Sequence, residues 1–399
     1  MSFQQRTHKT NIYAVVHKTN QLLQRLRGFA EAQFRQLSLK VFGTATTDRL
    51  KSWELLPKIS YSTKQFGMLC LEQETYKFPV SIRRNSCNDG SHTQPCFRYA
   101  YIANGFIAGN GRVLDSRSRL VNESIASHHS KVGNPGFLRT RKVRLSPGVA
   151  LNLNWWSGNG NIFHWNRDVL SRAFVMTALK NLEQLQLVVP SDRLPYQDHS
   201  INRLLQMFPN STLVEQEFSE WSRYENVIVP TCNSQDIGSG FLHPQVADFV
   251  RSVNLYGIQS DTTSIPVLYI SRRKSRHRRI LDEENLIEEL SRVAPVKVAC
   301  LEDYSYPEQM QLMGSVEVLV GPYGAGLTHL LFTRRHALIE IHNGDSKETH
   351  FATMALACGA KYVQIQGLES DIRQDFKLGL RGIRDVCEST VLYMRGKYA

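Results

Sequence analysis

The stretch Val316–Phe332, with the sequence VEVLVGPYGAGLTHLLF, predicts the architecture of the C-terminal part of the chain. It reads as a buried strand over Val316–Val320, a glycine-rich loop and a helix over Ala325–Phe332. A strand that enters a helix through such a loop is typical of α/β proteins with parallel sheets. Glycines let the backbone approach a ligand closely, and free N–H groups at a helix start bind anions. The loop glycines are Gly321, Gly324 and Gly326.

The spacing of these glycines limits the ligands that the loop is expected to hold. Gly-x-x-Gly-x-Gly differs from the Gly-x-Gly-x-x-Gly of nicotinamide-dependent oxidoreductases. A Walker loop needs Gly-Lys-Ser/Thr, which this loop lacks. The pattern therefore indicates either another kind of anion site or a tight turn without a ligand.

Alternating strands and helices extend over most of residues 154–399. The first set comprises helices over Phe163–Lys180, Gln197–Phe208 and Pro244–Tyr256, and strands over Leu185–Val189 and Asn226–Val229. The second set comprises strands over Val267–Ile270, Val296–Cys300, Val316–Val320, Ala337–Ile341 and Tyr362–Ile365, and helices over Glu283–Val293 (capped by Asp282), Tyr306–Met313, Ala325–Phe332 and Phe351–Cys358. Two such sets predict two Rossmann-like domains with parallel sheets, residues 154–260 and 261–399. Ligands of such sheets bind beyond the carboxyl ends of the strands.

Residues 1–153 follow other patterns. Residues 60–153 are rich in Gly, Asn, Ser and aromatic residues with short alternating segments, which predicts irregular β structure. Residues 1–59 carry apolar residues at helical spacing among many Lys and Arg, which predicts a basic amphipathic helix. Over residues 18–41 this helix is expected either to lie on an anionic membrane or to pack on its own domain.

Composition places the chain among folded proteins with anionic partners. The 399 residues include 48 Lys and Arg against 36 Asp and Glu, a net charge of +12, which suits nucleic acid, lipid headgroups or phosphorylated substrates. No apolar run approaches the roughly 20 residues that span a bilayer, and no signal peptide is recognised. The seven cysteines form no Cys-x-x-Cys pair, which favours reduced thiols in the cytoplasm over a Cys87–Cys96 disulfide.

A dense cationic run, Ser271–Arg279, follows the strand that ends at Ile270. Arginine binds phosphate oxygens with two parallel hydrogen bonds and keeps its charge, so the run suits a multivalent anion. The next helix opens with acidic residues, which disfavour a phosphate at its N-terminus, so side chains must hold the anion. Arg272 and Arg273 are the expected ligands, and Arg278 and Arg279 are expected to face solvent. The alternative is a solvated charge run throughout.

His164 and Asp168 stand four residues apart within the expected helix Phe163–Lys180. Residues at this spacing share one helix face, so a carboxylate and an imidazole there can act as a general base with an orienting partner. An ion pair on the helix surface is the alternative.

Together these motifs resemble glycosyltransferase family 61. The similarity is carried, between about Asn154 and Gln366, by Asn161-x-x-His164-Trp165-x-x-Asp168, by Ser271-Arg272-Arg273 with Arg276 and Arg278-Arg279-Ile280, and by Gly321-Pro-x-Gly-Ala-Gly-Leu-Thr328 with Leu331-Phe332 and Glu340-Ile341. The family includes plant xylosyl- and arabinosyltransferases and protein O-linked GlcNAc transferases. Two positions depart from its pattern, because Tyr323 stands where His is usual and His329 where Asn is frequent.

The resemblance implies a GT-B fold of two facing Rossmann-like domains, a nucleotide-sugar donor and inversion at the anomeric carbon. By position, Asp168 resembles the proposed catalytic base, accompanied by His164. Arg272 and Arg273 resemble the contacts to the donor diphosphate. The remaining donor-binding positions are Gly321, Tyr323, Gly324, Ala325, Gly326, Leu327, Thr328 and Glu340.

The sequence therefore predicts an inverting glycosyltransferase that acts in the cytoplasm, with possible contact to the inner membrane face. Its donor is expected to be a UDP-sugar and its acceptor a glycan, glycolipid or polysaccharide precursor, with no cofactor. The chain has no Asp-x-Asp, so no metal is expected at the diphosphate. Two alternatives stay open: a basic nucleic-acid-binding protein, against which the lack of aromatics within the arginine run counts, and an inactive glycosyltransferase-like scaffold.

Overall fold

A computed structural model describes residues 44–45, 50–56, 59–62, 91–94, 97–121, 124, 143, 145–154, 160–179, 184–218, 220–231, 242–259, 263–334, 336–343 and 350–395. The basic helix expected over residues 18–41 lies outside these residues, as do Cys87 and Cys96. The described part is an α/β structure with two large sheets, which confirms the predicted class.

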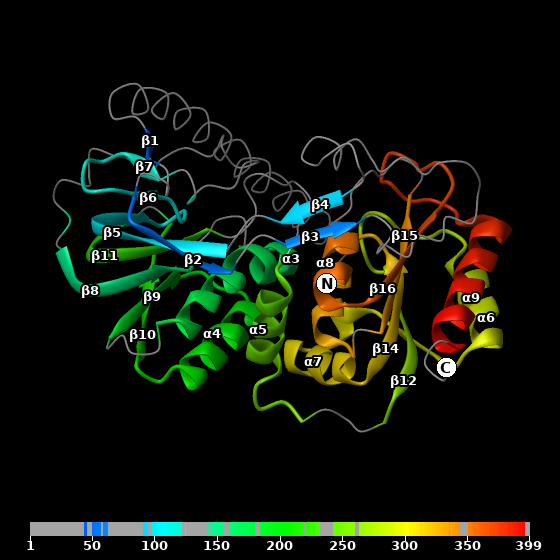
Figure 1. Cartoon of the computed structure of the whole chain (residues 1–399). Coiled ribbons are helices and arrows are strands. Elements are labelled where there is room, and N and C mark those ends of the chain that lie inside the picture. The colour runs from blue at the N-terminus through cyan, green and yellow to red at the C-terminus, as the bar shows by residue number, and fades with distance from the viewer. Residues whose placement is uncertain are drawn as a thin grey trace, which may run out of the picture.

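The first sheet is mixed and has nine strands in the order β1-β7-β6-β5-β11-β8-β9-β10, with β2 paired to β5 (Figure 1). Its strands are β1 (Thr44–Ala45), β2 (Ser52–Leu56), β5 (Phe97–Ala108), β6 (Val113–Leu114), β7 (Leu120–Val121), β8 (Leu145–Asn152), β9 (Leu185–Pro190), β10 (Ser211–Gln216) and β11 (Trp221–Thr231). Strands β11, β8, β9 and β10 are parallel, whereas the long β5 runs antiparallel to β11. A further pair, β3 (Ile59–Ser62) and β4 (Ser91–Gln94), stands apart.

The expectation of a purely parallel first sheet is therefore wrong. The physical reason is that β5 pairs with β11 over nearly its whole length, and β1, β2, β6 and β7 extend the sheet on the β5 side. The boundary predicted at residue 154 falls inside this sheet, since β8 lies between β11 and β9.

The second sheet is parallel, as predicted, with the order β13-β12-β14-β15-β16. It contains β12 (Ile265–Ile270), β13 (Val296–Ala299), β14 (Val316–Pro322), β15 (Ala337–His342) and β16 (Lys361–Gln366). Val267 and Tyr269 of β12 pack on one side with α6 (Glu283–Val293) and α9 (Gly379–Arg395). Leu268 and Ile270 pack on the other with α7 (Tyr306–Gly314), the 3-10 helix η10 (Ala325–Phe332) and α8 (His350–Cys358). The chain places β13 on one side of β12 and β14 on the other, so the strand order reverses between β12 and β14. Sheets of this kind bind ligands at such a switch point.

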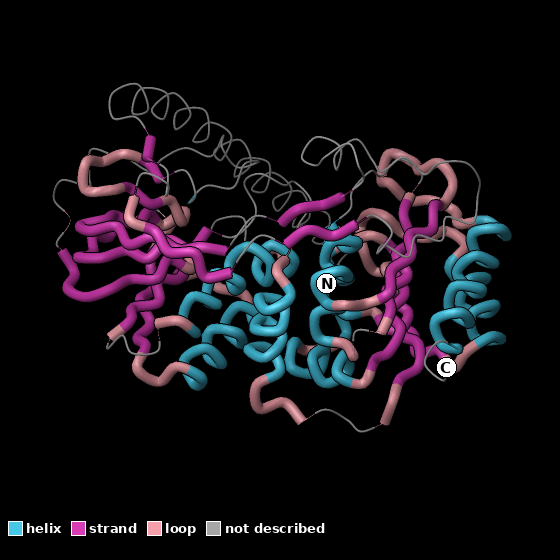
Figure 2. Tube along the Cα trace, viewed as in Figure 1, coloured by secondary structure: helices cyan, strands magenta, loops and turns pink. Residues whose placement is uncertain are grey.

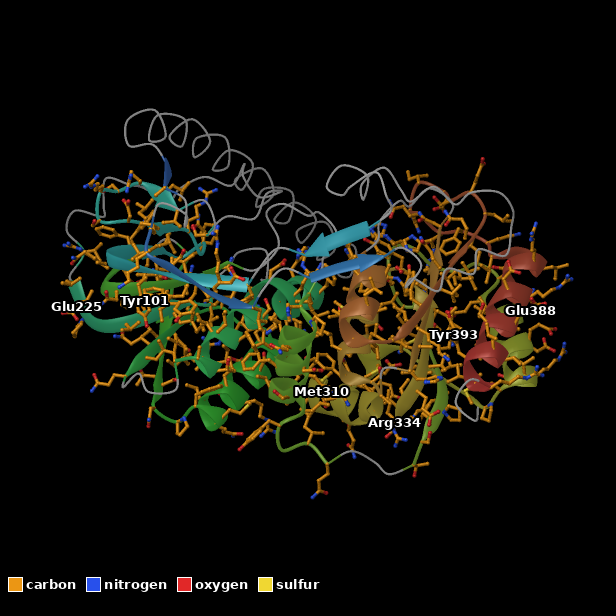
Figure 3. All side chains as sticks on the ribbon, in the orientation of Figure 1. Tyr101, Glu225, Met310, Arg334, Glu388 and Tyr393 are labelled. Atoms are coloured by element: carbon orange, nitrogen blue, oxygen red, sulfur yellow. The ribbon has the colours of Figure 1, made fainter. Side chains whose placement is uncertain are left out.

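Helices of both parts form a layer between the two sheets (Figure 2). From the first part come α4 (Pro195–Met207), α5 (Pro244–Leu255) and one irregular helix, Ile162–Thr177. They share a buried apolar core with α7, η10 and α8, in which Met310, labelled in Figure 3, is fully buried. At its centre the Asn254 side chain donates to Asn166 Oδ1 at 3.1 Å and accepts from the Tyr306 hydroxyl at 2.8 Å. Packing and hydrogen bonding therefore fix the site-bearing elements of the two parts against each other.

The irregular helix includes a π-helical turn over Trp165–Val169 and continues as a 3-10 helix over Leu170–Thr177. It begins with the α-helical turn α3 (Ile162–His164), where Asn161 Oδ1 accepts from the Phe163 N–H at 2.9 Å.

Among the described residues, no helix has both the length and the apolar composition that crossing a membrane requires.

Asp282 has a different partner from the one expected. Its carboxylate makes no capping hydrogen bond to α6 and accepts instead from the N–H groups of Leu378 and Gly379, at 2.8 Å each, where α9 begins. The local sequence places Asp282 at a helix start, but residues 96 and 97 positions further along the chain supply its donors. This carboxylate therefore ties α9 to the start of α6.

Replacing Asp282 by Ala is expected to lower the free energy of unfolding by about 1–2 kcal/mol, because two N–H groups at a helix start lose their acceptor. Chemical denaturation measures the loss. Glu284→Ala, at an exposed position in the first turn of α6, is the control and should change stability by less than about 0.5 kcal/mol. Equal effects of the two variants would contradict the assigned role of Asp282.

Candidate functional site

The arginine run and the glycine loop meet at the carboxyl edge of the second sheet, after β12 and β14. Gly321 lies against Ile270, since a Cβ added to it would lie 3.3 Å from the Ile270 carbonyl oxygen. Gly324 lies against the Arg272 guanidinium, and a side chain there would collide with Arg272 Nη1. Gly324 has φ 165°, an extended conformation open to any residue, so here glycine serves close approach. Two motifs about 50 residues apart in sequence thus form one site.

The cations of the run differ in how their charges are balanced. Arg273 Nε lies 3.6 Å from Glu283 Oε2, Lys274 pairs with Asp303, and Arg279 Nη2 lies 2.6 Å from Asp375 Oδ2. Within the described residues, Arg272 and Arg278 make no ion pair. The charge available to an external anion is therefore concentrated on these two arginines and on the exposed Arg276.

Arg272 is held by neutral acceptors. Its Nη2 donates to Ser275 Oγ at 2.9 Å and to the His277 carbonyl at 3.1 Å, and its buried Nε has no partner among the described residues. Burial lowers the pKa of the Arg272 guanidinium, and the nearby charge of Arg278 lowers it further. An arginine still stays protonated at neutral pH. A partly desolvated cation therefore lies on the glycine loop.

Arg278 and Arg279, expected to face solvent, are partly exposed, but both also have partners within the protein. Arg278 Nε donates to Gln374 Oε1 at 2.8 Å, and its guanidinium carbon lies 4.8 Å from the Tyr323 ring centroid. Arg279 donates from Nε and Nη2 to Asp375 Oδ2, at 2.9 and 2.6 Å. These partners come from the loop after β16, 96 positions along the chain, so no local pattern announces them.

Tyr323 lies between Arg278 and a buried polar group. Its ring centroid is 4.7 Å from that of His342, whose Nε2 lies 2.8 Å from Glu340 Oε1. The other carboxylate oxygen of Glu340 accepts from the Tyr362 hydroxyl at 2.6 Å. Glu340, expected at the donor site, is completely buried and reaches the loop through His342.

The rest of the donor loop enters η10. Ala325 and Gly326 open this helix, while Leu327 and Thr328 are buried. His329 is buried as well, with Nδ1 2.9 Å from the Gly326 carbonyl and Nε2 2.8 Å from Gln309 Oε1, and burial lowers the pKa of His329 to about 4. His329, one of the two departures from the family pattern, thus connects the start of η10 to α7.

Asp168 and His164 form the expected pair, in which the Asp168 carboxylate is buried and the His164 ring is partly exposed. Asp168 Oδ2 lies 2.8 Å from His164 Nδ1, and Arg167 donates from Nε and Nη2 to the same carboxylate at 2.6 and 2.9 Å. The side chain of Asp168 is 2% exposed and that of His164 is 25% exposed. The alternative of an ion pair on the helix surface is therefore excluded for Asp168.

Burial raises the pKa of the Asp168 carboxyl, but the charge of Arg167 and the hydrogen bonds from His164 and Arg167 lower it more. The net result is a pKa well below the ordinary value, so the group is a carboxylate at neutral pH. A charged carboxylate can only accept, so His164 Nδ1 is the donor within this pair.

Aromatic contacts connect this pair to the glycine loop. The Phe163 ring lies 5.3 Å from that of Phe351, and the Phe351 ring lies 5.8 Å from that of Tyr323. The ring centroids of Phe163 and His350 are 5.4 Å apart, and the Arg167 guanidinium carbon lies 4.8 Å from the Phe163 ring centroid. Phe163, His350 and Phe351 were not predicted as site residues, since apolar residues at helical spacing indicate only a core.

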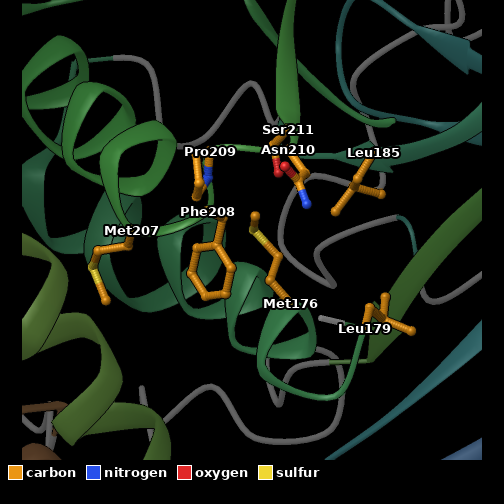
Figure 4. A pocket seen from close by; sticks show the side chains of 8 residues that line it. All are labelled: Met176, Leu179, Leu185, Met207, Phe208, Pro209, Asn210 and Ser211. Atoms are coloured by element: carbon orange, nitrogen blue, oxygen red, sulfur yellow. The ribbon is translucent and has the colours of Figure 1, made fainter. Parts of the chain in front are cut away.

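A separate pocket of about 300 Å³ lies at the amino ends of β9 and β10 (Figure 4). It is lined by Met176, Leu179, Leu185, Met207, Phe208, Pro209, Asn210 and Ser211, none of which belongs to the motifs. Within the described ranges no three His, Cys, Asp or Glu side chains gather as a metal-ligand group, and Cys300 and Cys387 are free thiols.

Asp168→Asn is expected to lower the free energy of unfolding at pH 7 by about 3 kcal/mol, because it leaves the buried Arg167 charge without a counter-charge. The folded-state pKa of Asp168 is depressed, so the carboxylate stabilises fully above its unfolded pKa, about 3.9, and the contribution is lost as pH falls through the folded value. Urea denaturation of wild type and variant from pH 7 to pH 3 should show a difference that shrinks below about pH 4. A difference that does not depend on pH would contradict the charged pair.

Comparison with known proteins finds similarity over the residues of the site. Residues 162–339 match the family model Glycosyltransferase 61, a range that contains the His164–Asp168 pair, the arginine run and the glycine loop. Similar proteins include the EGF domain-specific O-linked N-acetylglucosamine transferases of Canis lupus familiaris, 31% identical over 100 residues, and Bos taurus, 33% identical over 101 residues. Each of these matches covers 24% of this chain and 19% of the relative. The transferase of the same name from Drosophila melanogaster is 25% identical over 142 residues, 35% of this chain and 26% of that protein.

These matches confirm the resemblance to glycosyltransferase family 61 and support a glycosyltransferase as the class of protein. The matched stretches span only about a fifth to a quarter of the relatives' length.

Proposed function

We propose that the chain is a glycosyltransferase of GT-B type that transfers a sugar from a nucleotide-sugar donor to an acceptor hydroxyl with inversion. One observation carries the proposal: Arg272 lies on Gly324 of the glycine loop, at the point of the parallel sheet where α/β proteins bind ligands. A partly buried arginine beside the N–H groups of a helix start suits a phosphorylated ligand. The Glycosyltransferase 61 match over the same residues makes a nucleotide-sugar the matching ligand.

Stabilisation of the leaving group is the role proposed for this edge of the sheet. As the glycosidic bond to the donor breaks, negative charge grows on the diphosphate, and fixed positive groups lower the barrier by binding that charge more strongly than the ground state. Arg272 and the loop N–H groups supply such groups. In this proposal they take the place of a metal ion at the diphosphate.

His164 is the proposed general base, with Asp168 as its orienting partner. A base must reach the acceptor hydroxyl, and the His164 side chain is partly exposed, whereas that of Asp168 is buried and bonded on both oxygens. With Asp168 fixing Nδ1–H, the ring accepts the acceptor proton at Nε2, and the acceptor oxygen then attacks the anomeric carbon from the side opposite the leaving diphosphate. This assignment differs from the one implied by family resemblance, in which Asp168 itself is the base.

The activity for which these relatives are named suggests where to search for substrates. They transfer N-acetylglucosamine to EGF domains, which adds a protein hydroxyl to the glycans and glycolipids considered as acceptors. UDP-GlcNAc is accordingly the first donor to test, before other UDP- and GDP-sugars.

An inactive scaffold is the competing proposal, because Tyr323 and His329 depart from the family pattern. His329 is accommodated by Gln309 of α7, and the Tyr323 ring packs on His342. Neither substitution removes Arg272 or the His164–Asp168 pair from its place. The arrangement therefore favours an active enzyme.

The test is release of nucleoside diphosphate from a panel of nucleotide-sugars, with wild type and His164→Asn. Asparagine keeps a donor for Asp168 but has no titrating nitrogen, so kcat should fall by about 10²–10⁴-fold while donor affinity is unchanged. His277→Asn, at an exposed position, is the control and should retain activity.

Each outcome separates the alternatives. Turnover by His164→Asn at the wild-type rate would remove His164 as the base. Donor binding without any transfer by the wild type would favour the inactive scaffold. Absence of both binding and transfer over the whole panel would overturn the proposed function.

A further inference from the structure

Arg278, six positions after Arg272 in the sequence, is the second arginine at the glycine loop. Arg272 lies on Gly324 and Arg278 lies over the ring of Tyr323, so the two guanidinium groups contact adjacent residues of the same loop. Arg273, which the sequence placed beside Arg272 as the second ligand, bonds instead to Ser271 Oγ at 3.1 Å and lies near Glu283. Being next to Arg272 in the sequence therefore does not decide which arginine lies at the glycine loop.

Arg278 is held in place by the loop that follows β16. The residue adopts φ 61°, its N–H donates to the Arg373 carbonyl at 3.2 Å, and its Nε donates to Gln374 Oε1 at 2.8 Å. The neighbouring Arg279 is fixed to buried Asp375 through both its backbone N–H and its guanidinium. Such a clamp fixes a flexible side chain before any ligand arrives, which reduces the entropy lost on binding.

The acceptors that hold Arg272 and Arg278 are uncharged. Arg272 donates to a hydroxyl and a carbonyl, and Arg278 donates to an amide, so within the part of the chain that the structure describes neither is bonded to a carboxylate. Burial lowers the pKa of the Arg272 guanidinium, and the charge of Arg278 lowers it further, against the opposing charges of Glu302 and Asp375. Two like charges fixed near each other in a partly buried site are unfavourable until an anion lies beside both.

Three of the four other cations of the run lack this property, and the fourth, Arg276, is an exposed residue. Arg273, Lys274 and Arg279 each have a carboxylate within 4 Å, from Glu283, Asp303 and Asp375. An anion that binds there has to compete with a carboxylate that is already present, whereas one at Arg272 and Arg278 does not. The selection of the pair thus follows from charge balance as well as from position.

We propose that Arg278, in place of Arg273, is the second arginine that binds the donor diphosphate, with Tyr323 as the aromatic support on which its guanidinium lies. This inference rests on the proposed function, since it names the residues of the same donor site. A diphosphate carries enough oxygens to accept from both guanidinium groups. Tyr323 then has a binding role that a histidine in its place would supply less well, because tyrosine is the better aromatic partner of a cation.

Calorimetric titration with UDP and with inorganic pyrophosphate tests this assignment on the full chain. Arg278→Ala is expected to weaken UDP binding by about 10–100-fold, the range for losing one charge-assisted hydrogen-bonding side chain. Arg273→Ala is expected to change it by less than about threefold. Lys274→Ala, which removes one positive charge from an exposed ion pair in the same run, controls for net charge and should behave as Arg273→Ala.

Arg278→Lys shows whether a loss reflects binding or a disturbed loop. Lysine keeps the charge and the aliphatic stem but not the planar fork, so a loss smaller than that of Arg278→Ala, with an unchanged melting temperature for both variants, supports the inference. Wild-type affinity of Arg278→Ala, or a loss confined to Arg273→Ala, would overturn it while leaving the proposed function intact. Failure of the wild type to bind UDP, GDP and every nucleotide-sugar of the panel would instead overturn the proposed function.

Discussion

The contact between Arg272 and Gly324 is the constraint on which the site depends. Any side chain at position 324 would displace the Arg272 guanidinium from its present place, and the backbone there is extended, so the glycine serves close approach and not backbone conformation. The parallel strands β12 and β14 bring the two segments to the same edge, and the order of the sheet opens that edge. Sheet topology, glycine position and arginine position therefore act together, and none of them alone would create an anion site.

The second constraint is the buried charge of Asp168. Its carboxylate remains ionised in a nearly dry environment because Arg167 and His164 surround it, and the helix is locally widened to a π-turn at the same residues. π-turns inside helices are frequent at functional sites. The helix stands in the layer between the two sheets, and Phe163, Phe351 and Tyr323 connect it to the glycine loop. An acceptor activated at His164 and a donor held at Arg272 would thus be positioned by one continuous core.

The sequence predicted the second sheet well and the first sheet only in part. Strands such as Val316–Pro322 are buried throughout and read as continuous apolar runs, whereas β10 is half exposed and carries no clear pattern. The pairing of β5 with β11 joins segments more than 100 residues apart in sequence, and no local signal encodes it. The same limit applies to the site. Spacing located His164, Asp168, Arg272 and the glycines, but the roles of Arg278 and Asp282 depend on partners about 96 positions away.

The affinity of Gly324→Ala for UDP, measured by calorimetry, tests the central claim most directly. A methyl group at position 324 should displace the Arg272 guanidinium and weaken binding by roughly tenfold, with little loss of stability because the backbone there is extended. The same substitution made in an Arg272→Ala background should then cause no further loss, since the two changes remove one interaction. Wild-type affinity of the single variant, or losses that simply add in the double variant, would contradict the claim that the glycine loop and the arginine run form one anion site.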